Sequence, residues 1–265
     1  MQKISDINSV SILGAGNVGW HMALALKGCG IEIINIIAPS SEKASEIAKL
    51  AGAEPLTEID QLTRLPDLFL ICVSDDAIER VGAECIETGA FVAHTSGSTA
   101  LDVFGDHSDH AGVFYPLQTF SRNNPMDYRT ISFFIEGASV EMERRLSALA
   151  QKISGRWQIA DSESRKLIHI AAVFSCNFAN HMWAISHSLL KEQKIDFKIL
   201  LPLIEETFRK LGSMDPVQAQ TGPAKRLDRT TIDKHLAALG KKPFEQEIYE
   251  RISENIINYS RRVNE

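Results

Sequence analysis

The sequence predicts an α/β fold in which a doubly wound parallel sheet precedes an all-helical region. In the first 160 residues, short apolar runs of strand length alternate with amphipathic stretches of helical length, which is the pattern of βαβ units. After Asp161 the strand-like runs disappear, and helical periodicity continues to the C-terminus. We therefore expect two domains, at residues 1–160 and 161–265.

The apolar runs place the strands of the first domain. The expected strands are 10–13, 31–38, 68–73, 90–93, 131–135 and 157–159. The run at 68–73 is continuously apolar, as is typical of a parallel strand buried on both faces. Helices are expected at 18–27, at 41–50, and from Ala77, where Ser74 and Asp75 are suitable N-caps.

Charge and cysteine usage narrow the class of protein. The net charge of −6 argues against a nucleic-acid-binding protein. Residues 1–160 carry 12 Lys and Arg against 20 Asp and Glu, whereas residues 161–265 carry 16 against 14, a difference that supports two domains. The four cysteines have no paired spacing and the N-terminus does not read as a secretory signal, so we expect reduced thiols in the cytoplasm.

A glycine motif lies between the first strand and the first helix. It reads Gly14-Ala15-Gly16-Asn17-Val18-Gly19. In a dinucleotide site the first glycine makes the tight turn, the second admits the pyrophosphate, and the third lets helix and strand pack closely. A glycine-rich turn without a ligand is the alternative. The strand-to-helix context favours a dinucleotide, whose phosphates would lie at the helix N-terminus.

The end of the second strand indicates which dinucleotide is bound. An NAD site usually has Asp or Glu there, to bind the ribose 2′-hydroxyl. This sequence has no acid at the strand tip and continues with Ser40, Ser41, Glu42 and Lys43. Hydroxyl groups and a cation suit the 2′-phosphate of NADP, although either serine could simply cap the following helix.

Two further loops follow strands at the edge of the sheet where ligands bind. One contains Val73, Ser74 and Asp75, and the other runs from His94 through Ser96 to Ser98. The second loop offers an imidazole and hydroxyl groups for the nicotinamide end of the site, or is a capped turn without a ligand. A third stretch, 115–120, could line the same cleft.

The segment 167–190 contains no charged residue. Its histidines, asparagines and serines would be costly in hydrocarbon, so we interpret it as a buried helix at a subunit interface and expect a homodimer. At 100° per residue, an α-helix would place Lys166, His169, Asn177 and Asn180 within an arc of about 80°. This polar stripe is either a hydrogen-bond network, a dimer seam or a ligand site.

Taken together, these motifs resemble those of one family. The resemblance rests on the glycine motif, the loops at 40–43, 73–76, 94–98 and 116–120, and the segments 166–177 and 221–226. The family comprises proteins described as NADP oxidoreductases, in which a Rossmann-like domain precedes an uncharacterised helical domain. It is similar to pyrroline-5-carboxylate reductase, deazaflavin-dependent NADP reductases and β-hydroxyacid dehydrogenases. The resemblance implies NADP binding and dimers.

The chain departs from these better-known relatives at two places. The β-hydroxyacid dehydrogenases have an asparagine four residues after a catalytic lysine, whereas Ile170 lies four residues after Lys166. Pyrroline-5-carboxylate reductases have a Gly-Ser-Gly-Pro segment where this chain has residues 174–177. The resemblance therefore specifies no substrate.

The expected function is hydride transfer between NADPH and a small carbonyl or imine compound. The alternative is a non-catalytic NADP-binding sensor or scaffold. Reduction needs a proton donor near neutral pH, and the candidates are Lys166 or His169, with Ser96 and Asn177 orienting the substrate and His94 a weaker candidate. No metal is expected, because the loop 106–110 is typical of a solvated loop. Lys225, Arg226 and Arg229 could meet an anion or form a solvated helix face.

Overall fold

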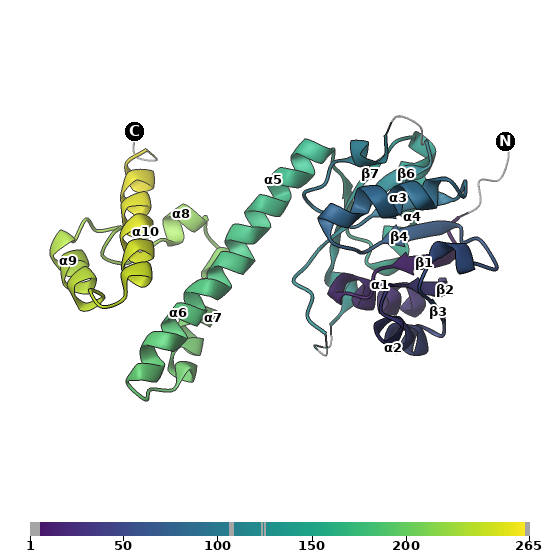
Figure 1. Ribbon diagram of the computed structural model, residues 1–265. Coiled ribbons are helices and arrows are strands. Elements are labelled where there is room, and N and C mark those ends of the chain that lie inside the picture. Colours follow the sequence, from purple (N-terminus) through teal and green to yellow (C-terminus); the bar gives the residue numbers. More distant parts are fainter. Residues whose placement is uncertain (1–5, 106–108, 123, 125, 263–265) are drawn as a thin grey trace. The chain divides into compact units, whose positions relative to one another are not determined.

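The computed structural model describes residues 6–105, 109–122, 124 and 126–262. The chain forms two compact units, Met1–Asn177 and Phe178–Glu265 (Figure 1). The division lies beyond residue 161, where the sequence pattern changes, because the first helix after that point packs with the N-terminal sheet.

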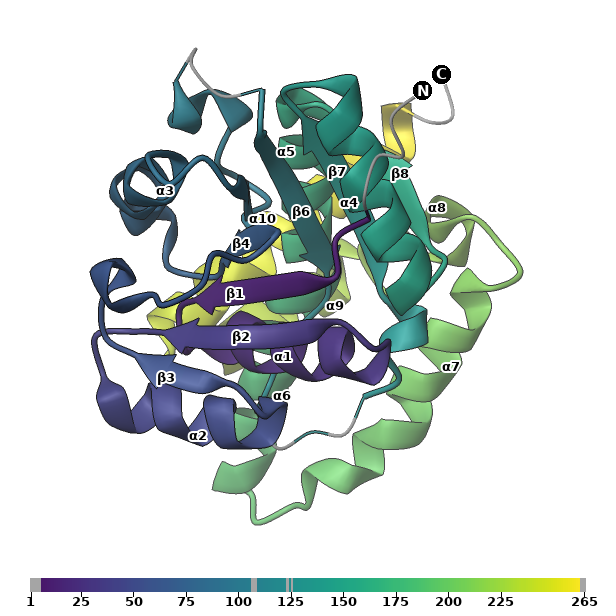
Figure 2. The same ribbon diagram turned by 90° about the vertical axis from the view of Figure 1, so that its right-hand side faces the viewer.

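The first unit is built on one eight-stranded sheet with the strand order β3-β2-β1-β4-β5-β6-β7-β8 (Figure 2). The strands are β1 Ser9–Leu13, β2 Glu32–Ile37, β3 Glu54–Leu56, β4 Leu68–Ile71, β5 Phe91–His94, β6 Ala111–Leu117, β7 Ser132–Gly137 and β8 Trp157–Ile159. All neighbouring strands pair in parallel except β6 and β7. The predicted parallel sheet is confirmed, although neither β3 nor β6 was expected.

Helices cover both faces of this sheet. They are α1 Asn17–Gly28, α2 Ser41–Ala51, α3 Ile78–Ile86, α4 Val140–Ile153 and α5 Ser162–Ala172, with 3-10 turns at Ile59–Gln61, Asp75–Ala77, Leu101–Phe104 and Tyr128–Thr130. Helices α1, α2 and α4 pack on one face, where Val10 and Ile12 point. Helix α3 packs on the other face, against Leu13 and Phe69. The alternation of side chains along β1 thus divides the core into two layers.

Within the described residues 178–262, the second unit consists of helices joined by turns and short loops, without strands. Its helices are α6 Ala179–Glu192, α7 Leu201–Leu211, α8 Pro216–Ala219, α9 Arg229–Ala238 and α10 Pro243–Arg262, with a 3-10 turn at Phe197–Leu200. Aspartates cap several of these helices; the Asp228 carboxylate, for example, accepts a hydrogen bond of 3.0 Å from the Thr231 amide. A small core contains Ala224, Ile232 and Ile257.

The segment after α5 differs from the expected regular helix. Residues Val173–Phe178 form a π-helix between α5 and α6. A π-helical turn holds more residues than an α-helical turn, so the predicted arc from Lys166 to Asn180, which assumed 100° per residue throughout, is wrong beyond Val173. Within the single chain, Leu167 is 68% exposed and Phe174 64%, so burial of this segment remains a prediction that depends on the expected subunit interface. None of the described helices is long and apolar enough to cross a membrane.

Candidate functional site

The glycine loop after β1 shows a different constraint at each glycine. Gly14 has φ = +108°, and a Cβ at this position would collide with the carbonyl group of Cys72. A Cβ at Gly19 would collide with the carbonyl oxygen of Gly14, so the close packing of helix on loop requires glycine. A Cβ at Gly16 would meet nothing within 4 Å. Gly16 therefore leaves open space in front of the loop rather than relieving a clash.

The N-terminus of α1 is suited to an anion. Gly16 is its N-cap, no side chain accepts from the first amides, and the first turn contains no acidic residue. The Asn17 side chain is directed elsewhere, donating a hydrogen bond of 3.1 Å to the Phe120 carbonyl oxygen. Unsatisfied amides and the positive end of the helix dipole make a phosphate-binding site. The residues present thus fit the pyrophosphate of a dinucleotide.

A cavity of about 870 Å³ lies beside this loop, at the ends of β1, β2 and β4. Its lining includes Gly14, Pro39, Thr57, Val73 and Arg80. It is large enough for the adenosine part of a dinucleotide. Arg80, which was not singled out from the sequence, forms an exposed ion pair of 3.0 Å with Glu84.

The predicted 2′-phosphate residues lie at the start of α2. Ser40, Ser41 and Lys43 are all exposed. The Ser40 hydroxyl accepts a hydrogen bond of 3.4 Å from the Lys43 amide, so Ser40 caps α2, which was one of the two roles expected for it. The Ser41 hydroxyl and the Lys43 ammonium group are accessible to a ligand.

Arg122 is a second cation that the sequence did not indicate. Its guanidinium group donates to the carbonyl oxygen of Ala15 in the glycine loop and pairs with Glu46 of α2 at 2.9 Å. It also lies 5.1 Å from the centre of the Trp20 ring. Arg122 comes from the segment that follows β6, and only the tertiary structure brings it to the glycine loop.

The loops after β4 and β5 meet through their side chains. The Ser98 hydroxyl donates a hydrogen bond of 2.5 Å to the Asp75 carboxylate. The Ser96 hydroxyl accepts from the amides of Ser98 at 3.1 Å and Thr99 at 3.0 Å. The oxygen of Ser96 is thus occupied in a capped turn, the alternative that the sequence left open. Ser74, at the other loop, carries no side-chain cap bond.

His94 is held as a neutral imidazole. Its side chain is fully buried, and its Nδ1 accepts a hydrogen bond of 3.1 Å from the Ser96 amide. Burial, together with the charge of Arg165, lowers the pKa of His94 to about 3. An imidazole with this pKa is uncharged near neutral pH and is therefore no general acid there, whereas its Nδ1 holds the Ser96 amide and supports the turn.

Tyr115 of β6 and His169 of α5 form a hydrogen-bonded pair beside this turn. The Tyr115 hydroxyl lies 3.0 Å from His169 Nδ1, and the two rings are nearly perpendicular, with centroids 5.8 Å apart. A Cβ at Gly97 would lie 2.7 Å from Tyr115 Cζ and 2.8 Å from His169 Nδ1. Burial raises the pKa of Tyr115, which keeps its hydroxyl protonated. The sequence placed Tyr115 only as a lining residue.

A buried ion pair fixes the helix that carries His169. Arg165 is 0% exposed, pairs with Glu136 of β7 and donates a hydrogen bond of 2.6 Å to the Thr99 carbonyl oxygen. Ser162 donates to the same carboxylate at 2.8 Å. The start of α5 is thereby attached both to β7 and to the turn after β5, which sets the position of His169 four residues after Arg165.

Among the described residues, neither Lys166 nor Asn177 forms a hydrogen bond with the Tyr115–His169 pair. Lys166 and Asn177 are exposed, and Asn177 lies within the π-helix. Lys225, Arg226 and Arg229 belong to the second unit. Residues 106–108 of the loop considered for a metal lie outside the described residues, and no group of three or more metal-ligating side chains occurs within the described part of the chain.

Two family models match separate segments of the chain, and solved structures match nearly its whole length. Residues 3–117 match the model of a Rossmann-like domain, and residues 131–256 match a domain of unknown function, DUF2520. A crystal structure of a "putative NADP oxidoreductase" from Bacteroides fragilis is 39% identical, covers 97% of this chain and 100% of its own, and superposes with a TM-score of 0.89. No curated protein gives a significant match.

More distant structures share the fold alone. A Thermotoga maritima protein is 22% identical with a TM-score of 0.72, covering 97% of this chain and 100% of its own. An Aspergillus terreus reductive aminase, crystallised with NADPH and ethyl levulinate, is 14% identical with a TM-score of 0.71, covering 97% and 95%. The expected family resemblance is confirmed: the chain belongs to the family of the Bacteroides fragilis protein and carries a Rossmann-like domain followed by a DUF2520 domain.

Proposed function

We propose that the protein is an NADP-dependent oxidoreductase that reduces a small carbonyl or imine compound with NADPH. The Tyr115–His169 pair carries this proposal, because it places two proton-carrying groups beside the turn after β5, at the edge of the sheet where the nicotinamide of a Rossmann domain binds. The similar Bacteroides fragilis protein is described as an NADP oxidoreductase, and the reductive aminase of the same fold was crystallised with NADPH.

The cofactor contacts follow from the glycine loop. The free amides of α1 would bind the pyrophosphate, with Gly16 allowing its approach. Ser41 and Lys43 would bind the 2′-phosphate, and Arg122, held at the Ala15 carbonyl oxygen, would add positive charge beside the phosphates. The absence of an acid at the tip of β2 supports NADP over NAD.

NADPH, when bound by the residues of the glycine loop, would supply a hydride for the carbon of the substrate C=O or C=N bond. The oxygen or nitrogen then gains the electron pair of that bond and needs a proton. The Tyr115 hydroxyl donates this proton, and His169, hydrogen-bonded to Tyr115 at 3.0 Å, returns one to the tyrosine oxygen. His169 is half-buried and can be reprotonated from solvent, which closes the cycle.

The homodimer expected from the sequence, with the segment 167–190 at its interface, is retained as part of the proposal, and we extend that interface to helix α7. Helix α7 exposes an apolar face, with Phe208 77%, Leu211 51% and Leu201 42% exposed. These residues recur at helical spacing, so they form one stripe rather than scattered positions. A second copy of the chain would cover this stripe. Sedimentation of F208E/L211E should give monomers where the wild type gives dimers, and a monomeric wild type at micromolar concentration would contradict the dimer.

The proposed reaction is tested by following NADPH consumption with panels of small ketones, aldehydes and cyclic imines. Calorimetric titration of NADPH and NADH accompanies the panel. We expect tighter binding of NADPH and, with at least one substrate, one mole of reduced product per mole of NADPH oxidised. Tight NADPH binding without turnover on any panel member would identify a non-catalytic NADP-binding protein instead, and equal or better binding of NADH would refute the assignment of the cofactor.

A further inference from the structure

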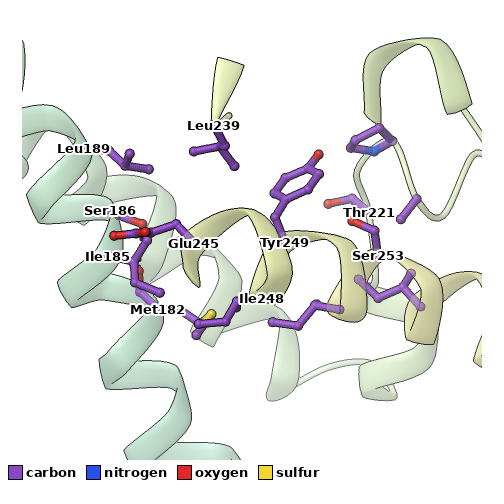
Figure 3. Close-up of a pocket in the computed structure, with 14 residues that line it drawn as sticks. Met182, Ile185, Ser186, Leu189, Thr221, Leu239, Glu245, Ile248, Tyr249 and Ser253 are labelled. Atoms are coloured by element: carbon purple, nitrogen blue, oxygen red, sulfur yellow. Dashed lines mark hydrogen bonds between the residues drawn. The ribbon is translucent and has the colours of Figure 1, made fainter. Parts of the chain in front are cut away.

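The second unit contains a cavity that is lined by its own residues. It has a volume of about 330 Å³ and lies between α6, α10 and the segment 221–224 (Figure 3). Its wall is mostly apolar: Met182, Ile185 and Leu189 come from α6, and Ile248, Ile252 and Ile256 from α10. The volume is at the lower end of the range of about 300–1,000 Å³ for small-molecule sites, so a small ligand would fill it.

The charge that lines this cavity is negative. Glu245 is its only charged lining residue, and Lys, Arg and His are absent from the described residues that line it. Glu245 is half-buried and forms no ion pair within the described residues. An unpaired carboxylate beside an apolar wall favours a cation and repels an anion.

Hydroxyl groups lie at the other end. Ser253 lines the cavity with only 8% of its surface exposed, and its hydroxyl makes no hydrogen bond to any described residue. It lies eight residues after Glu245 on α10, which corresponds to about 12 Å along the helix axis at 1.5 Å per residue. Figure 3 shows Ser253 and Thr221 on one side and Glu245 on the other, with Tyr249 and Ile248 between them.

This arrangement selects the chemistry of the ligand. A charged end must meet Glu245, because an ion that leaves water without a partner is strongly disfavoured. The middle of the ligand must be hydrocarbon to replace water at the isoleucine and methionine side chains. A polar group at the far end would form a hydrogen bond with the Ser253 hydroxyl. An anion would be repelled by Glu245, and a strongly polar molecule would leave the apolar wall of the cavity without a matching surface.

We propose that this cavity binds a small, linear aliphatic amine in its protonated form. The ammonium group binds Glu245, the alkyl chain lies along Ile248 and Ile252, and a terminal hydroxyl, where present, bonds to Ser253. The proposal does not rest on the NADP-dependent reaction proposed above, because every residue that lines the cavity belongs to the second unit.

Calorimetry on the full chain tests the proposal with three probes of one length at pH 7: hexylammonium, 1-hexanol and hexanoate. Hexylammonium should bind at least tenfold more tightly than hexanoate, with 1-hexanol between them. E245Q keeps the shape of the side chain and removes its charge, and should weaken hexylammonium at least tenfold. E247Q changes an exposed residue of the same helix that does not line the cavity and should leave binding unchanged.

The far end of the cavity is tested with 6-amino-1-hexanol. It should bind more tightly than hexylammonium, and S253A should abolish that difference while retaining the binding of hexylammonium itself. Hexanoate binding as tightly as hexylammonium, unchanged affinity in E245Q, or no binding of any amine at millimolar concentration would each overturn the proposal. The last result is also the one expected if a second copy of the chain fills the cavity.

Discussion

The Tyr115 hydroxyl and His169 Nδ1 lie 3.0 Å apart, although the two residues are separated by 54 positions in the chain. Tyr115 is near the end of β6, and His169 is in the third turn of α5. Gly97 packs against both rings, so the turn after β5, the strand and the helix meet at this pair. The proposed donation of a proton by Tyr115 depends on the contact of these three elements.

Gly14 should be needed for the stability of the fold, whereas Gly16 should be needed for the binding of NADPH. Gly14→Ala should destabilise the fold, because it combines a φ of +108° with a collision at Cys72. Gly16→Ala should fold normally, because its Cβ meets nothing within 4 Å, yet should weaken NADPH binding at least tenfold. Thermal unfolding and calorimetric titration check the two expectations. Unchanged NADPH affinity in G16A would contradict the assigned pyrophosphate site.

Arg122 should contribute to cofactor affinity. A charge-assisted hydrogen bond to a phosphate is worth about 1.5–3 kcal/mol, so Arg122→Met should weaken NADPH binding roughly 10- to 100-fold. Arg129→Met is the matched control, since Arg129 is exposed and pairs with Asp127 rather than with the glycine loop. If both variants bind NADPH as the wild type does, Arg122 only supports the loop.

The buried pair of Arg165 and Glu136 should be important for stability. Breaking a buried ion pair typically costs about 3–5 kcal/mol, because a charge remains without its partner. We expect Arg165→Met to lower the free energy of unfolding by this amount in urea titrations. Arg64→Met, which breaks the exposed Arg64–Glu32 pair, should cost less than about 1 kcal/mol. Similar small losses in both variants would contradict the anchoring of α5.

The free energy of unfolding should decrease at acid pH because His94 is buried in its neutral form. Its pKa is about 3 in the folded chain, lowered mainly by burial from an ordinary value of 6.5. Between these values the unfolded state binds the additional proton, so the stabilisation is complete above pH 6.5 and is lost as the pH falls toward 3. His94→Asn removes the titrating group. The difference in unfolding free energy between wild type and H94N should therefore shrink by up to about 1.4 kcal/mol per pH unit across this range, and a constant difference would contradict it.

The sequence predicted the parallel sheet and the glycine loop because both have local signals. Apolar runs mark the buried strands, and the glycine spacing directly follows one of them. Strand β6 gave no such signal, because Gly112 and Pro116 interrupt its apolar pattern, so Tyr115 was not placed on a strand. Strand β3 is short and contains Pro55 between a glutamate and a leucine, which does not read as a strand.

The rest of the site depends on tertiary structure. Arg122 reaches Ala15 across 107 positions of the chain, and no local pattern indicates such a contact. The π-helix at Val173–Phe178 changes the number of residues per turn, so the regular helical arc could not be extended to Asn177. Among the described residues, His169 is the one predicted catalytic residue that is hydrogen-bonded to Tyr115. The sequence indicated Tyr115 itself only as a residue that could line the cleft.

The central claim is that Tyr115 and His169 deliver the proton during reduction. With a substrate from the panel in hand, Y115F, H169A and K166A are compared with the wild type for kcat and for NADPH affinity. The account predicts that Y115F and H169A each lose about 10²–10⁴ in kcat, the usual contribution of general acid catalysis, while NADPH affinity changes less than about twofold and K166A remains near wild type. Full turnover by Y115F, or a loss in K166A as large as that in H169A, would contradict it.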